Sequence, residues 1–236
     1  NAGVAVTTGT HNTLIGGLAG DALTTGSEHV AVGGNALTTD DVGSRSVAIG
    51  TGALRDQNTA TATSVYNTAV GHFAGGTMTT GIVNTLVGGL AGDAITTGND
   101  NTVLGYGSLS ANSASNRNTA VGSATLAVFN VTTDTHTYNT ALGYGAGNTV
   151  TSGINNTLVG GLAGDALTDA DDNTAMGRGA LSTDTLGSKS TAIGRNALTT
   201  QNFTTATDSY NTAVGYQAGL EVTTGAQNTY VGALAG

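Results

Sequence analysis

Cysteine, proline and tryptophan are absent from this chain of 236 residues, and only 9% of its side chains are charged. Without cysteine there is no disulfide or thiolate chemistry, which fits an extracellular repeat protein that gains stability from stacking. No stretch approaches the roughly 20 apolar residues that a membrane-spanning helix needs, and no basic-then-apolar leader opens the chain. We expect no membrane contact by this segment, and we expect it to be a window of a longer chain.

Basic residues are also scarce, because the chain has 6 of them against 15 acidic ones and a net charge of −9. A chain without a basic stripe cannot displace many counterions from phosphates, so nucleic acid is not an expected partner. Aromatic residues make up only 4% of the chain, and most apolar residues are small. These proportions predict a thin core.

A single five-residue phrase recurs along the whole chain, and one copy reads Asn67-Thr68-Ala69-Val70-Gly71. Thirteen copies are present. They close at Gly16, Gly33, Gly50, Gly71, Gly88, Gly105, Gly122, Gly143, Gly160, Gly177, Gly194, Gly215 and Gly232. The closing glycines lie 17 residues apart except at three 21-residue steps, so a four-coil unit of 72 residues repeats.

A 17-residue repeat is too short for a helix pair or a propeller blade, but it suits one coil of a solenoid. The sequence therefore predicts an all-β, parallel β-solenoid, with residues 1–236 as one continuous repeat rod. Because stacked strands lie about 4.8 Å apart, the rod would be roughly 60 Å long, with a superrepeat of about 19 Å.

Alternation within the phrase assigns residues to two faces. The second and fourth positions, such as Thr68 and Val70, share a face, and the large aliphatic residue at the fourth position predicts that this face is the core. The third position would then point outward, yet it is never polar. This predicts that another chain or another part of the same fibre covers it, with a homotrimer as the preferred assembly. A second short strand is expected around residues 36–37 and their equivalents.

The first position forms a structural Asn column, in which stacked amides are expected to hydrogen-bond along the rod. It comprises Asn12, Asn67, Asn84, Asn101, Asn118, Asn139, Asn156, Asn173, Asn211 and Asn228, and His29, Ser46 and Ser190 interrupt it. The alternative is a polar stripe that binds a ligand.

A charged column precedes the phrase. It places Glu28, Asp100 and Asp172 one 17-residue coil before Arg45, Arg117 and Lys189, respectively. Adjacent rungs would pair each acid with a base and so fix the register of stacking. Recognition of a partner is the alternative.

Tyr66, Tyr138 and Tyr210 continue the charged column at the ends of the long-coil insertions, residues 59–65, 131–137 and 203–209. These insertions should protrude. The tyrosines could bind a glycan or a protein through a rigid aromatic face, or pack over the corner near the preceding base.

Catalysis finds little support in the sequence, since its four histidines have no partnered carboxylate or nucleophile at recognisable spacing. The acidic run from Asp169 departs from a calcium loop, because Thr174 stands where glycine is required. We therefore predict no enzymatic activity, cofactor or metal site.

The phrase resembles the head repeat of YadA-like trimeric autotransporter adhesins, especially at Ser46-Val47-Ala48-Ile49-Gly50 and Ser190-Thr191-Ala192-Ile193-Gly194, and also repeats of phage tail fibres. This resemblance implies a left-handed β-roll, a homotrimer and exposure at a cell or virion surface.

Three functions follow from these patterns. The first is a structural extracellular fibre or shaft. The second is an adhesin head that binds a surface receptor or glycan through the inserted loops. The third is an ice-binding solenoid, suggested by recurrent threonine and by the alternation of Thr59, Thr61 and Thr63.

Overall fold

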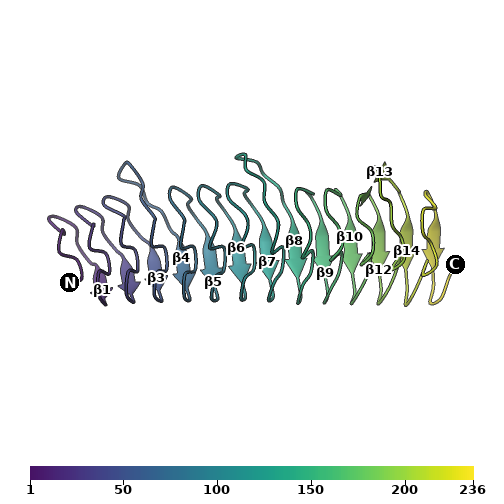
Figure 1. Cartoon of the computed structure of the whole chain (residues 1–236), viewed down its shortest axis with the longest axis horizontal. Helices are drawn as coiled ribbons and strands as arrows, with labels where there is room; N and C mark the ends of the chain where they lie inside the picture. The colour runs from purple at the N-terminus through teal and green to yellow at the C-terminus, as the bar shows by residue number, and fades with distance from the viewer. The chain divides into compact units, whose positions relative to one another are not determined.

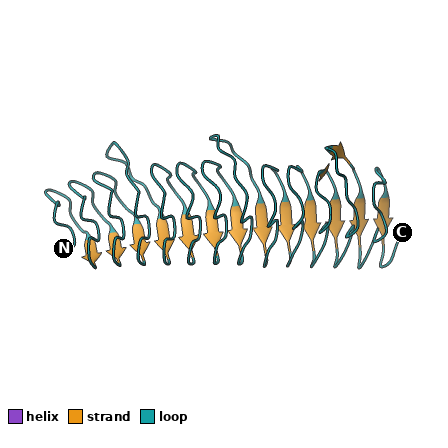
Figure 2. Cartoon of the chain, in the orientation of Figure 1, coloured by secondary structure: helices purple, strands orange, loops and turns teal.

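A computed structural model describes all residues from Asn1 to Gly236 and shows a parallel β-solenoid of stacked coils. The chain contains strands, turns and loops but no helix, so no helix long and apolar enough to span a membrane is present (Figure 2). It divides into two compact units. The first comprises Asn1–Arg117 with Thr132–Thr135, and the second comprises Asn118–Val131 with His136–Gly236.

Each of the thirteen phrases forms one three-residue strand. In the first unit these are β1 (Thr13–Ile15), β2 (Val30–Val32), β3 (Val47–Ile49), β4 (Thr68–Val70), β5 (Thr85–Val87) and β6 (Thr102–Leu104). In the second they are β7 (Thr119–Val121), β8 (Thr140–Leu142), β9 (Thr157–Val159), β10 (Thr174–Met176), β12 (Thr191–Ile193), β14 (Thr212–Val214) and β15 (Thr229–Val231). Within each unit these strands lie side by side in chain order (Figure 1).

The strands keep one register through the long coils. In the first unit Ile49 of β3 pairs with Val70 of β4, and in the second Val121 of β7 pairs with Leu142 of β8. Each insertion therefore loops out without shifting the phrase. The third insertion also pairs locally, because β13 (Thr207–Asp208) lies parallel to β11 (Gly187–Ser188).

The two faces of the phrase are the reverse of the sequence prediction. The third position is the core column: Ala69, Leu86 and Ala141 are fully buried. The fourth position faces outward, as the exposure of Leu104 and Leu142 shows. The prediction was wrong because alternation defines two faces but does not say which one is inside.

Buried side chains of complementary size fill the coil. A bulky residue at the third position, as in Leu86, accompanies a glycine six residues later, Gly92, whereas the small Ala48 accompanies Leu54. A Cβ atom on Gly92 would lie 3.0 Å from Leu86, so the leucine occupies the space that the glycine leaves. In these coils one large side chain therefore occupies the space that the other position leaves.

The second strand that we expected after each phrase is absent, because the chain turns there. Leu37 and Leu54 are fully buried but have φ of 51° and 48°, in the left-handed region that strands do not use. Arg45, in the charged column, is also left-handed, with φ of 67°. Each coil therefore closes through left-handed corners, and stacking must offset their conformational cost.

Candidate functional site

The outward face of the sheet is a regular surface in each unit. Its second column is threonine in eleven of the thirteen coils, and its fourth column is aliphatic or methionine in all of them. Exposure in the fourth column ranges from partial to 58% at Ile15 and 71% at Val231. An exposed strand face normally carries polar residues, so this apolar column is a candidate contact surface.

The predicted axial ion pairs form at two of the three positions. Arg45 Nε lies 2.9 Å from Glu28 Oε2, and Arg117 Nε lies 3.6 Å from Asp100 Oδ2. Hydrogen bonding to the Arg45 guanidinium lowers the pKa of the Glu28 carboxyl. Because these groups are exposed, their ion pairs add little to the stability of the fold. Fixing the register of neighbouring coils is therefore the role that suits them better.

The third predicted pair, Asp172 with Lys189, is wrong. Lys189 Nζ instead lies 2.5 Å from Asp208 Oδ2, which belongs to the inserted loop. The bond to Lys189 lowers the pKa of the Asp208 carboxyl. The sequence could not show this because the loop folds back over the column, where β13 pairs with β11. Asp172 accepts a hydrogen bond from Asn155 Nδ2 at 3.1 Å.

The insertion tyrosines pack against neighbouring side chains, which for Tyr66 and Tyr210 are bases of the charged column. The Arg45 guanidinium lies 5.7 Å from the centre of the Tyr66 ring and donates to its hydroxyl oxygen at 3.1 Å. Lys189 Nζ lies 5.4 Å from the Tyr210 ring. Tyr138 makes an edge contact with His136 at 6.0 Å between ring centres. All three rings remain about half exposed. Of the two alternatives for these tyrosines, the structure shows the one in which they pack against neighbouring side chains. Their use in recognition stays a prediction.

The Asn column lies inside the coil and forms an amide ladder. Asn84 donates from its backbone N–H to Asn67 Oδ1 at 2.9 Å, and from Nδ2 to the same oxygen at 3.3 Å. Asn67 Nδ2 donates across the coil to the Gly81 carbonyl at 2.7 Å. In the second unit Asn156 repeats these bonds with Asn139 and Ala170. Because most of these side chains are buried, the ladder is a structural element rather than a ligand-binding stripe.

His29 interrupts the Asn column but reproduces its bonds. Its Nε2 lies 2.7 Å from the Gly43 carbonyl oxygen, and its Nδ1 accepts from the Ser46 backbone N–H at 3.2 Å. A carbonyl can only accept and an amide can only donate, so the Nε2–H tautomer is required. The buried imidazole therefore replaces an asparagine.

Sequence reasoning missed a buried polar network at the two serines of the Asn column. Gln57 Nε2 donates to Asp40 Oδ2 at 2.6 Å and to Ser46 Oγ at 3.0 Å, and its Oε1 accepts from Asn67 at 3.0 Å. Asp184, Ser190 and Gln201 repeat this network. The sequence does carry a signal for this network. In the 72-residue copy that has Asn118 where the other two have serine, Asn112 replaces the aspartate and Phe129 replaces the glutamine.

The acidic residues do not assemble a metal centre. No three His, Asp or Glu side chains come together in a way that could hold a metal ion, and no pocket is present. Asp169 and Asp171 instead accept hydrogen bonds from Ser152 and the Ile154 backbone N–H of the preceding coil. Burial raises the pKa of the Asp93 and Asp165 carboxyls, whose Oδ1 atoms have no hydrogen-bond partner.

Comparisons with protein-family models, with curated proteins and with solved structures find no match.

Proposed function

We propose that the protein is a structural subunit of an extracellular fibre, exposed at a cell or virion surface, and that it assembles with copies of itself through the outward face. The observation that carries this proposal is the aliphatic fourth column, which is apolar in every coil and at least partly exposed. Burying such side chains yields about 25 cal/mol per Å² of apolar surface. Assembly therefore supplies the stability that a thin core lacks.

A second copy of this chain fits the face because it has the same rung spacing. Strand pairing sets that spacing at about 4.8 Å in any parallel ladder. Two or three copies can therefore match their fourth columns rung for rung, whereas a partner with an irregular surface could match only a few rungs. Closed symmetry then favours a homotrimer or a dimer over open aggregation.

Sedimentation equilibrium of the purified chain tests this assembly. The variant L142K/V159K/M176K places three charges on neighbouring rungs of the outward face in β8, β9 and β10. The matched control, T204K/T205K/A206K, adds the same charges at an exposed insertion tip. We expect the parent and the control to be oligomers, preferably trimers, and the outward-face variant to be monomeric with an unchanged circular dichroism spectrum. A monomeric parent, or an oligomer that survives the face substitutions, would overturn the proposal.

Ice binding is a second candidate, and one structural observation favours it. The outward second column is threonine on seven successive strands of the second unit, from Thr119 to Thr229. The threonines are thus not confined to the insertions, and they lie beside the aliphatic column in a regular array. A monomer would leave this array open to ice, whereas an oligomer would cover it. Thermal hysteresis measured on the purified chain separates the two functions, and its absence would eliminate ice binding.

The adhesin function rests on the inserted loops and stays a prediction. Their tips are exposed at residues 60–62, 132–134 and 204–206, so a receptor could reach them. Deletion of all three tips should abolish receptor binding and leave the fold intact if this function is correct.

A further inference from the structure

Two arginines in the second unit have no carboxylate partner. The chain has only six Lys and Arg residues, and four of them form ion pairs. The other two, Arg178 and Arg195, directly follow the closing glycines of neighbouring phrases. Met176 pairs with Ile193 in register, and the Asn196 N–H donates to the Arg178 carbonyl at 3.0 Å, so the arginines lie on adjacent rungs.

Two like charges on adjacent rungs repel each other, and the fold does not require them. The equivalent positions in the other 72-residue copies hold Gly34 and Tyr106 for Arg178, and Thr51 and Ser123 for Arg195. In a chain with a net charge of −9, an unpaired arginine pair therefore indicates a site for an anionic group from another molecule.

Aromatic residues border the arginine pair on the same column. Tyr216 lies on the next rung, with the Arg195 guanidinium 5.8 Å from its ring centre. Tyr144 lies two rungs before Arg178; its side chain is 67% exposed, and only its backbone carbonyl takes part in a hydrogen bond, accepting from Leu162 N–H at 2.9 Å. Between them is Gly161, where an added Cβ would meet only the Tyr144 carbonyl oxygen, at 3.9 Å. The column therefore offers an open aromatic face, a floor without side chains, and two cations in one line.

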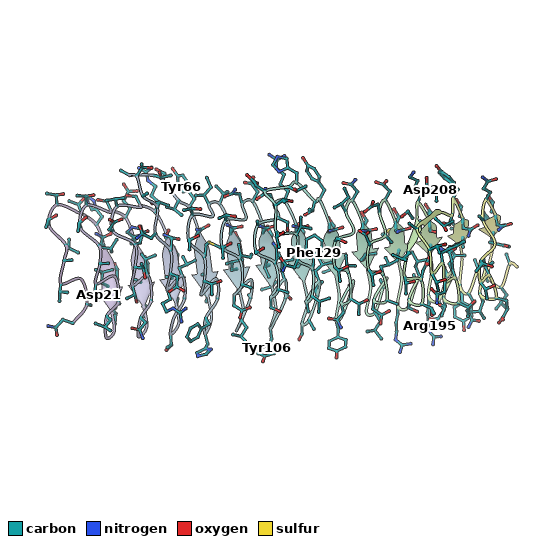
Figure 3. The ribbon with its side chains drawn as sticks, turned by 45° about the horizontal axis from the view of Figure 1, so that its top comes forward. Asp21, Tyr66, Tyr106, Phe129, Arg195 and Asp208 are labelled. Carbon is teal, nitrogen blue, oxygen red and sulfur yellow. The ribbon has the colours of Figure 1, made fainter.

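This line runs along an edge of the second unit that is distinct from the insertions. Figure 3 shows Arg195 at the edge opposite Asp208. A linear ligand lying along the stacking direction could contact the Tyr144 ring, the Gly161 floor and the arginines in turn. We propose that this edge, Tyr144, Gly161, Arg178, Arg195 and Tyr216, binds an acidic polysaccharide whose sugar rings carry carboxylate or sulfate groups.

The chemistry of the edge favours a sugar polymer over nucleic acid. Arginine presents a planar fork of donors that matches a carboxylate or sulfate in a bidentate manner. The apolar side of a sugar ring can pack on the exposed Tyr144 face. A nucleic acid would find only two cations that are not already in ion pairs on a strongly acidic protein, so few counterions would be released on binding.

Fluorescence anisotropy with labelled oligomers tests the proposal on the full chain. The probes are a size-defined oligogalacturonate, its methyl ester, a dextran sulfate oligomer and single-stranded DNA. We expect saturable binding of the oligogalacturonate, the dextran sulfate or both, which identifies the acidic group, with little binding of the methyl ester or DNA. No binding of either acidic sugar, or tighter binding of DNA, would overturn the proposal.

Matched variants locate the site. R178G/R195S takes residue types from equivalent rungs, so it should fold, and it should weaken binding at least about tenfold because two charge-assisted contacts are lost. R178K/R195K should give an intermediate affinity. The control R55A/K189Q removes two charges outside the edge and should keep the parent affinity. Equal affinities of R178G/R195S and the parent, with both folded by circular dichroism, would contradict the assignment.

Discussion

The closing glycine of each phrase occupies backbone space that other residues avoid. At Gly88 φ is +134°, and an added Cβ would lie 2.6 Å from the Gly105 carbonyl oxygen of the next rung. The adjacent Gly89 has no such constraint, since its Cβ would meet Tyr106 at an ordinary 3.5 Å. The backbone therefore requires glycine at position 88 but not at position 89, and these two neighbours allow a matched comparison.

Gly88→Ala should lower the free energy of unfolding by about 3 kcal/mol, because the new methyl group both strains the backbone and separates two rungs. Gly89→Ala should change it by less than about 1 kcal/mol. Chemical denaturation monitored by circular dichroism measures both values. Similar losses for the two variants would refute this explanation of the closing glycine.

His29 provides a second test at the residue scale. His29→Ala leaves the buried Gly43 carbonyl and the Ser46 N–H without their side-chain partners and should cost about 3 kcal/mol. His29→Asn restores the residue type of the column and should stay within about 1 kcal/mol of the parent. Urea midpoints of the three proteins make the comparison, and an Asn variant as unstable as the Ala variant would show that the imidazole has another role.

The role of a residue could be predicted from the sequence where the repeat itself specifies its partner. The Asn column follows from its recurrence, because an amide can bond to an identical amide on the next rung. The role of His29 does not follow, since a lone histidine has many possible partners. Lys189 was assigned to the wrong acid because Asp208 belongs to a loop whose path is not encoded in the 17-residue period.

At the scale of the coil, the Asp40, Ser46 and Gln57 network behaves as one unit. Ser46→Asn alone should destabilise the chain by about 2 kcal/mol, because the larger side chain competes with Gln57 for the same buried space. The triple variant D40N/S46N/Q57F reproduces the residues of the copy at Asn112, Asn118 and Phe129, and should recover most of that loss. Thermal unfolding of the triple variant and of the three single variants D40N, S46N and Q57F measures the coupling, and simple additivity of the single substitutions would argue against a network.

The coil also shows why the faces were predicted in reverse. Size suggested that Val70 lies inside and Ala69 outside, as in a thick globular core. In a coil this narrow, the inner column must be small where a leucine enters from the corner, as Ala48 and Leu54 show. The better signal was polarity: the third position is never polar, whereas the second is usually threonine.

At the scale of the whole molecule, the solenoid predicts that stability is a sum over coils and their interfaces. Deletion of one 17-residue period should then be tolerated, because it removes one whole coil. Removing residues 156–172 joins Asn155 directly to Asn173, so that the Asn column, the outward face and the core column all remain in register.

Deleting residues 156–171 instead leaves one extra residue at the corner before the phrase, where the four-residue insertions of the long coils loop out. A single residue is too short to form such a loop, so we expect it to shift the strand that follows and to move its side chains to the opposite face. We expect the longer deletion to fold with a slightly lower thermal midpoint, since one rung of hydrogen bonds is lost. The shorter deletion should lose a much larger part of its cooperative unfolding transition, although it retains more residues. Circular dichroism melts of both variants against the parent make the comparison. Equal tolerance of the two deletions would mean that the second unit does not depend on the register of its Asn and core columns.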